Sequence, residues 1–313
     1  MSNFMQKKIE VNTDSLSLQE VFPRFVAHQI ANGVSEKTVQ TYKSHLHSIS
    51  KHFDLSFPFA NLTQDDINAC IVSMRQSGLA HNSVSSYARV LRTFTKWCRE
   101  QGYTSVVVPN IRDRETVKET YTESELKALL RKPNKKCDFT EYRNWVIINF
   151  LLNCGCRAAT IRNIKNKDID LHTKQVVYRH TKNGKVQYIP LCNQMVSIFR
   201  EYVAIREGDA DDYLFCSEYG EMLSEDALRE AIYKYNRSRG VRKTSIHAFR
   251  HSFARMYLVD CGGDAFTLQK LLGHSTLVMT KHYCTIYDQD IANNFDKVSP
   301  LARISAQKQK IKK

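Results

Sequence analysis

Apolar side chains recur every three or four positions through the first third of the chain, which is the period of an amphipathic helix. Turn and capping signals divide this pattern into four segments. We predict helices over residues 16–31, 35–53, 65–76 and 82–101. No convincing strand pattern interrupts them, so we predict a helical domain over 14–103, preceded by a flexible polar segment, 1–13.

The pattern breaks over residues 104–120, which contain a β-branched run, a proline and then mixed charges without a long apolar stripe. We interpret this segment as an interdomain linker. A capping-box signature, Thr122 to Glu125, follows it and opens a second domain, which we place at 121–313 with a basic C-terminal tail.

The second domain mixes helical and alternating patterns. Its most apolar segment, 140–152, predicts a central core helix that stops at Gly155, with a short helix over 158–164. Runs rich in Val, Ile and Tyr predict three strands, over 168–171, 175–179 and 187–191. Asn183-Gly184, between the last two strands, is a strong hairpin signal. Helical patterns return four times, over 195–206, 224–239, 266–273 and from 287 to 294. The fold class is therefore predicted as mostly α, with a small antiparallel sheet in the C-terminal domain.

The charge balance narrows the class of partner. Lys and Arg number 46 against 32 Asp and Glu, which gives a net charge of +14. Residues 1–120 contain only 14 of the basic and 11 of the acidic side chains. Such an excess favours a polyanion, nucleic acid before an anionic membrane. The longest apolar run, 145–156, is too short to span a bilayer, and the N-terminus lacks the apolar core of a signal peptide. We expect a cytoplasmic protein whose nine cysteines are reduced, with Cys154 and Cys156 as small buried residues.

Several enzyme classes lack their motifs here. There is no Walker-type loop, no Gly-rich dinucleotide turn after a strand, and no HExxH. We also find no convergent cluster of acids for magnesium, which argues against a two-metal nuclease. We expect no cofactor and no metal.

The stretch 245–287 concentrates the candidate chemistry. His247 and Arg250 are three residues apart and share one face if they lie on one helix. His274 follows a glycine that suits a helix C-cap, and Tyr283 lies nine residues further on. These groups predict a phosphate site that needs a second arginine, which Arg157 at the end of the core helix supplies.

Four segments match one pattern in order and spacing: LLNCGCRAATIRNI, HTKNGKVQYIPL, HAFRHSFA and LLGHSTLVMTKHYC. Over about 120–300 the chain resembles the tyrosine recombinases, also called the phage integrase family, and the N-terminal helices fit that family's core-DNA-binding domain more loosely. The resemblance implies six catalytic residues, namely Arg157, Lys182, His247, Arg250, His274 and Tyr283. It also implies a 3′-phosphotyrosyl intermediate, attack by the 5′-hydroxyl of another strand, and strand exchange between two duplexes.

The residue types suit this chemistry. A Tyr hydroxyl can hold the phosphate covalently and so keep the energy of the phosphoester bond. Its ordinary pKa is about 10, so cations and a base must assist it. Arg157 and Arg250 would hold the non-bridging oxygens, and Lys182 would protonate the departing 5′ oxygen. His247 would accept the Tyr proton or hold the phosphate, and His274 would donate a further hydrogen bond.

Some alternatives stay open. Lys185 competes with Lys182, and Tyr287 competes with Tyr283, which the nine-residue spacing favours. We interpret His251 and His282 as packing or surface residues, and each remaining site residue also has a plain structural reading as a capping, salt-bridging or surface group. Thr160 occupies a position where the family usually carries an acid, so we expect a functional but more loosely oriented site.

The predicted function is a site-specific DNA recombinase or integrase, built as a two-domain clamp on duplex DNA and serving a mobile genetic element. By resemblance, four copies would assemble on two DNA sites, with the segment 291–304 docking on a neighbouring copy. An accessory directionality factor is a further expected partner. Only about 14 residues precede the first predicted helix, so we expect no additional arm-type domain. A relaxing topoisomerase of the same chemistry and a non-catalytic DNA-binding relative are the alternative functions.

Overall fold

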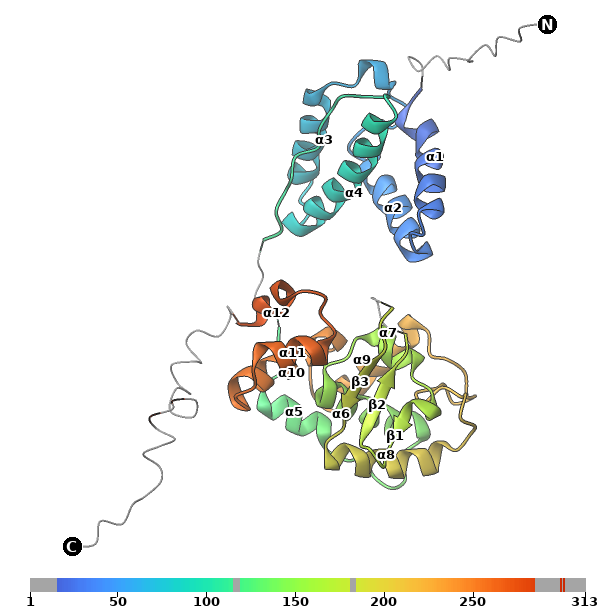
Figure 1. Ribbon diagram of the computed structural model, residues 1–313, viewed down its shortest axis with the longest axis vertical. Helices are drawn as coiled ribbons and strands as arrows, with labels where there is room; N and C mark the ends of the chain where they lie inside the picture. The colour runs from blue at the N-terminus through green and yellow to red at the C-terminus, as the bar shows by residue number, and fades with distance from the viewer. Residues whose placement is uncertain (1–15, 115–118, 181–183, 285–298, 300, 302–313) are drawn as a thin grey trace, which may run out of the picture. The chain divides into compact units, whose positions relative to one another are not determined.

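The computed structural model describes residues 16–114, 119–180, 184–284, 299 and 301, without the side chains of Lys281, His282 and Cys284. The chain divides into two compact units, Met1–Thr116 and Val117–Lys313. Both units are mostly helical, and the second carries a three-stranded antiparallel sheet, so the predicted fold class is confirmed (Figure 1). Within the described ranges, no helix combines the length and the apolar character that crossing a membrane requires.

The first unit packs α4 against three other helices (Figure 1). The helices are α1 (Leu18–Ala31), α2 (Glu36–Ile49), α3 (Gln64–Gln76) and α4 (His81–Glu100), with a 3-10 turn, η2 (Phe59–Asn61), before α3. Ser17 and Thr63 form capping boxes that fix where α1 and α3 begin. Aromatic rings fill the core between α1 and α4, where the Phe25 and Phe94 centroids lie 5.2 Å apart.

Two predictions for this unit need correction. The second helix ends at Ile49 and not near Phe53. The His52 N–H donates to the Ile49 carbonyl three residues back, in a tighter turn than that of an α-helix. The predicted linker is also not free of the unit over its first half. Val106 and Val108 are buried in the unit's core. The β-branched run that suggested a connector is therefore a packing segment.

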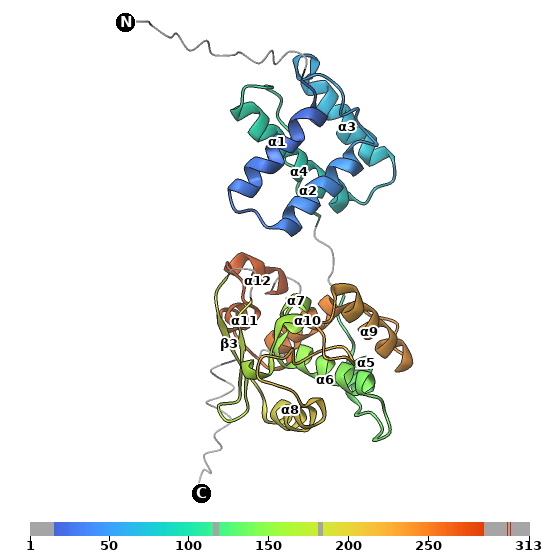
Figure 2. The ribbon, with the colours of Figure 1, turned by 90° about the vertical axis from the view of Figure 1, so that its right-hand side faces the viewer.

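The second unit is organised around α6 (Phe139–Cys154), which packs against α5 (Glu123–Leu130), α8 (Asn193–Arg206), α9 (Glu225–Ser238) and α10 (Ile246–Arg255) (Figure 2). Its middle residues are buried on every side, as the continuous apolar run predicted. The shorter helical elements are α7 (Ala158–Asn163), η3 (Asn166–Asp168), η4 (Met256–Asp260), α11 (Ala265–Leu272) and α12 (Leu277–Cys284).

The sheet has the order β1 (Ile169–Asp170), β2 (Gln175–Tyr178) and β3 (Gln187–Pro190), with Val176 opposite Ile189. The predicted hairpin is therefore present. Its last paired residues are Tyr178 and Gln187, so the connection is longer than a two-residue turn at Asn183-Gly184. Lys182 lies in this connection, outside the described residues.

Gly155 ends α6 in the left-handed conformation, with φ of 58°. A Cβ at this position would lie 2.5 Å from the Phe253 ring and 2.9 Å from the Leu272 side chain. No L side chain fits such a position without strain, and the backbone here must approach α10 and α11 closely.

We expect Gly155→Ala to lower the free energy of unfolding by about 2–5 kcal/mol, since a left-handed L residue costs about 1–2 kcal/mol and overpacking about 1–3 kcal/mol. Gly184→Ala is the matched control, because its φ is 67° but no described atom lies within 4 Å of the added Cβ. It should cost only about 1–2 kcal/mol. Urea denaturation of both variants measures the difference, and equal losses would contradict the close packing at Gly155.

Candidate active site

Five of the predicted site residues lie where α10, α11 and α12 meet the end of α6. Arg157 is the residue before α7, two positions after the glycine that ends α6. His247 and Arg250 lie on α10, as their spacing predicted. His274 follows the left-handed cap of α11 at Gly273, also as predicted, and Tyr283 lies on α12. Lys182 and Tyr287, the competitor of Tyr283, lie outside the described residues.

Arg250 joins the elements of the site. Its side chain is buried, its Nη1 donates to the Gly155 carbonyl at 2.8 Å, and its Nη2 donates to the Leu272 carbonyl at 2.9 Å. The same Nη2 lies 2.8 Å from Nε2 of His274. The end of α6, the end of α11 and the following loop are thus held by one guanidinium.

The contact with Arg250 fixes the tautomer of His274. A guanidinium has only donors, so Nε2 of His274 must accept and its ring hydrogen lies on Nδ1. Nδ1 lies 2.9 Å from Oγ1 of Thr280, which is fully buried, and donates to it. Burial, with Arg250 and Arg157 as further causes, lowers the pKa of His274 to about 4. Sequence reasoning missed Thr280; the available signal was its place on α12, three residues before Tyr283 and so on the same face.

The low pKa of His274 predicts how stability depends on pH. An unfolded His titrates near about pH 6.5, so between pH 6.5 and about 4 the unfolded chain binds a proton that the folded ring does not. The contribution of His274 to stability is therefore fully present above pH 6.5 and is lost as pH falls toward 4. In His274→Gln the amide oxygen can accept from Arg250 but does not titrate. Urea denaturation at pH 7, 6 and 5 should show a smaller loss of stability for this variant than for the unchanged protein, and parallel losses would contradict the assignment.

Arg157 lies close to Arg250 and shares a partner with it. Its Nη1 approaches the Leu272 carbonyl at 3.5 Å, the same oxygen that accepts from Arg250. Burial and then the charge of Arg250 lower the pKa of Arg157, while Tyr283 raises it. Burial, Arg250 and Arg157, in that order, lower the pKa of His247.

In the part of the chain that the structure describes, no carboxylate forms an ion pair with either arginine. Two neighbouring guanidiniums of this kind have the charge and the donors to bind an anion, so we call Arg157 and Arg250 the candidate anion site.

Tyr283 lies beside this anion site. Its side chain is 8% exposed, and its ring stacks on His274 with centroids 6.0 Å apart and an interplanar angle of 12°. Its hydroxyl lies 3.1 Å from Nδ1 of His251. His251, which we interpreted as a packing or surface residue, thus contacts the hydroxyl of the predicted nucleophile. The side chain of His282 is not among those described.

Thr160, at the position where an acid was expected, is buried on α7. Its backbone N–H donates to the Arg157 carbonyl at 2.9 Å. Within the described ranges, no hydrogen bond joins its hydroxyl to Arg157, His247 or Arg250. The effect of this hydroxyl on catalysis stays a prediction.

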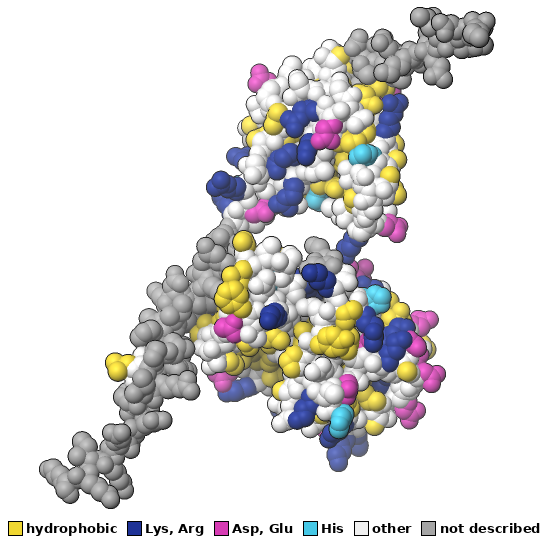
Figure 3. All heavy atoms as spheres, in the orientation of Figure 1, with side chains coloured by type: hydrophobic (Ala, Val, Ile, Leu, Met, Phe, Trp, Pro, Cys, Tyr) yellow, Lys and Arg dark blue, Asp and Glu magenta, His cyan; other side chains and the backbone are white. Residues whose placement is uncertain are grey.

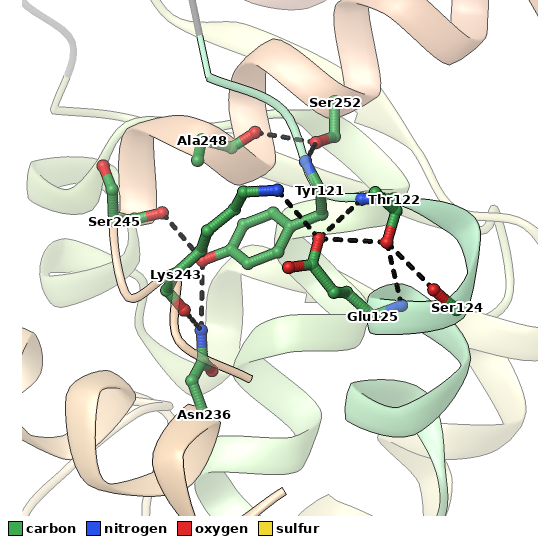
Figure 4. Close-up of polar contacts among 9 residues, drawn as sticks. All are labelled: Tyr121, Thr122, Ser124, Glu125, Asn236, Lys243, Ser245, Ala248 and Ser252. Atoms are coloured by element: carbon green, nitrogen blue, oxygen red, sulfur yellow. Dashed lines mark hydrogen bonds and ion pairs between the residues drawn. The ribbon is translucent and has the colours of Figure 1, made fainter. Parts of the chain in front are cut away.

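The start of the second unit holds α10 in place (Figure 4). The backbone N–H of Tyr121 donates to Oγ of Ser252 at 2.8 Å, and its hydroxyl donates to the Ser245 carbonyl at 3.2 Å. The Tyr121 ring stacks on Phe249 with centroids 4.2 Å apart, and Asn236 donates to its hydroxyl at 3.0 Å. Tyr121 thus bonds near both ends of the helix that carries His247, Arg250 and His251.

His274 contacts Arg250, and both arginines lower the pKa of His247 after burial. Among the described side chains, no group of three or more His, Cys, Asp or Glu is placed to hold a metal ion. Cys154 and Cys156, beside Gly155, are buried free thiols, and burial raises the pKa of Cys156.

Sequence comparisons cover both units. A sequence profile of the Phage integrase family matches residues 119–290, and a profile of the phage integrase N-terminal SAM-like domain matches residues 23–102. Tyrosine recombinase XerC of Alcanivorax borkumensis is 23% identical over 303 residues, which cover 94% of this chain and 98% of the relative. Tyrosine recombinase XerC of Staphylococcus epidermidis is 27% identical over 299 residues, which cover 91% and 98%.

The fold also resembles that of solved proteins. In a crystal structure, a lambda integrase tetramer is bound to a Holliday junction. That chain superposes with a TM-score of 0.70 at 17% identity, covering 86% of this chain and 78% of the other.

Proposed function

Because this chain belongs to the phage integrase family, we propose that it is a site-specific DNA recombinase, which cleaves and rejoins DNA through a 3′-phosphotyrosyl intermediate. The observation that carries the proposal is the pair Arg157 and Arg250, which share the Leu272 carbonyl, beside the hydroxyl-bearing ring of Tyr283. Two planar cations suit a phosphodiester, and a tyrosine next to them suits attack on its phosphorus.

The reaction begins when a phosphodiester of DNA enters the anion site. Arg157 and Arg250 bind its non-bridging oxygens and stabilise the charge that grows in the pentacoordinate state. Oη of Tyr283 forms a bond to phosphorus and passes its proton to a histidine of the site, and the bond from phosphorus to the 5′ oxygen breaks. Lys182 donates a proton to that leaving oxygen.

His247 and His274 assist the phosphate. Both arginines lower the pKa of His247, and this residue binds a phosphate oxygen. Nε2 of His274 accepts from Arg250. A phosphate that draws the guanidinium away frees this ring nitrogen, and the negative charge favours a protonated ring that donates to the phosphate.

The phosphotyrosyl bond keeps the energy of the phosphoester that was broken. The 5′-hydroxyl of a second strand then attacks the same phosphorus, the bond to Oη breaks, and the tyrosine regains its proton. Strand exchange between two duplexes therefore needs no ATP.

The surface charge supports DNA binding. Lys and Arg side chains gather around α3 and α4 on the face of the first unit in Figure 3. Arg89 and Lys96 of α4 have exposed side-chain fractions of 57% and 68%. Phosphate contacts of this kind release counter-ions, so affinity should fall steeply with added salt.

Exchange between two duplexes requires more than one copy of the enzyme. The lambda integrase that shares this fold is a tetramer on a Holliday junction. We propose a homotetramer on two DNA sites in the cytoplasm, with a directionality factor as an additional partner.

Covalent capture of DNA tests the proposal. Randomly nicked duplexes covering the DNA on both sides of the gene are incubated with the protein, and protein-linked DNA that survives detergent is sequenced. We expect one recurrent cleavage site, and two copies of that site on a plasmid should recombine. Relaxation of a supercoiled plasmid without recombination would instead indicate a topoisomerase. DNA binding without covalent capture would indicate a non-catalytic relative.

A further inference from the structure

The hydroxyl of Tyr283 has a direct partner on the neighbouring helix. Nδ1 of His251, on α10, lies 3.1 Å from Oη of Tyr283, on α12, and the two ring centroids are 5.5 Å apart. α10 and α12 are in contact. Arg250 precedes His251 and is held by two carbonyls, so the backbone that presents His251 is fixed by the same bonds that place the arginine.

This distance allows proton transfer. A general base must lie within about 2.6–3.2 Å of the oxygen whose proton it takes. In the tautomer that carries its hydrogen on Nε2, the Nδ1 of His251 accepts a hydrogen bond from the Tyr283 hydroxyl.

The other two histidines of the site have different partners. Both ring nitrogens of His274 are engaged, Nε2 by Arg250 and Nδ1 by Thr280. His247 lies on α10 three residues before Arg250, and we assign it to the phosphate-binding groups. Among the described residues, the hydrogen-bond partner of the Tyr283 hydroxyl is His251 and not His247.

We propose that His251 is a catalytic residue that accepts the proton of Tyr283 as its oxygen attacks phosphorus. The assignment rests on the proposed recombinase function. In cleavage, the Oη–H bond breaks, its proton moves to Nδ1, Oη forms the bond to phosphorus, and the 5′ oxygen leaves with a proton from the general acid. In rejoining, the 5′-hydroxyl attacks, the bond from phosphorus to Oη breaks, and the proton returns from His251 to the tyrosine.

Three substitutions separate proton transfer from orientation. His251→Asn places an amide oxygen near the position of Nδ1, so it can orient the hydroxyl but cannot take its proton. His251→Ala removes both functions and leaves room for added imidazole. His172→Asn is the matched control, since His172 is exposed and lies in the turn between β1 and β2. The measurement is the rate at which each variant becomes covalently linked to a nicked duplex that carries the cleavage site identified with the wild-type protein. Thermal unfolding and DNA binding of each variant are measured as well.

We expect both His251 variants to fold and to bind DNA but to cleave about 10²–10⁴-fold more slowly, the usual contribution of a general base. Imidazole should restore part of the rate of His251→Ala and leave His172→Asn unchanged. A rate for His251→Asn within about threefold of the wild type would overturn proton transfer by this residue, as would a loss in His251→Ala that imidazole does not relieve. If the wild-type protein itself captures no DNA, the recombinase function fails first, which is distinguishable from failure of the His251 assignment.

Discussion

A Tyr283→Phe variant is expected to fold and bind DNA normally but to form no covalent complex with it, a loss of more than about 10⁴-fold in capture rate. Phe keeps the ring that stacks on His274 and loses only the hydroxyl that contacts His251. The change therefore removes the nucleophile with little effect on packing. Detergent-resistant protein–DNA complexes on a nicked duplex give the measurement.

Tyr287→Phe is the control, because Tyr287 follows one helical turn later in the sequence and was the competing nucleophile. It should capture DNA at the wild-type rate. Retained capture by Tyr283→Phe, together with loss in Tyr287→Phe, would reverse the assignment.

The second large effect concerns alanine variants of the two arginines. Both variants should lose most of the cleavage activity, but they should differ in the free energy of unfolding. Arg157→Ala and Arg250→Ala should each lower the cleavage rate by about 10²–10³-fold or more, since each removes a donor to the transition state. Arg250→Ala also leaves the Gly155 carbonyl without this donor and the Leu272 carbonyl with only the 3.5 Å contact of Arg157, at about 1–3 kcal/mol for each weakened carbonyl. Arg157 makes only a 3.5 Å contact, so its removal should cost less than about 1 kcal/mol.

Urea denaturation and single-turnover cleavage of the same two preparations test this difference. We expect Arg250→Ala to lose about 2–5 kcal/mol of stability and Arg157→Ala to keep nearly all of it. Equal stabilities would show that the carbonyl contacts of Arg250 are not important for the fold, and wild-type cleavage by either variant would contradict its place in the phosphate site.

Local signals in the sequence were sufficient to predict most elements of the fold. Some helix boundaries depend only on residues close together in the chain, so the sequence alone predicts them. Examples are the capping boxes at Thr63 and Thr122 and the glycines that end α6 and α11. The continuous apolar run of α6 likewise predicted its burial on every side.

Features that depend on distant contacts were not readable in the same way. Val106 and Val108 lie in a segment whose sequence suggested a connector. Their burial becomes evident only when the core of the first unit is seen to pack against them. The partner of His251 lies 32 residues away, and the partners of His274 lie 24 and 6 residues away. These contacts therefore depend on how α10, α11 and α12 meet. The spacing in the sequence predicted the tyrosine, but only the three-dimensional structure identifies the group that contacts its hydroxyl.

The anchoring of Tyr121 sets a practical boundary for anyone who divides this protein. Its backbone N–H, its hydroxyl and its ring all bind α10 or the residue before that helix. A recombinant catalytic fragment that began at Thr122 would lack these contacts. Among the described residues, the Ser245 carbonyl would keep only its bond from the Ala248 N–H, and the Phe249 ring would lose the Tyr121 ring that stacks on it. A fragment intended for kinetics or crystallisation should therefore start upstream of Tyr121, so that the residue enters as an internal peptide with an ordinary amide and not as a charged amino terminus.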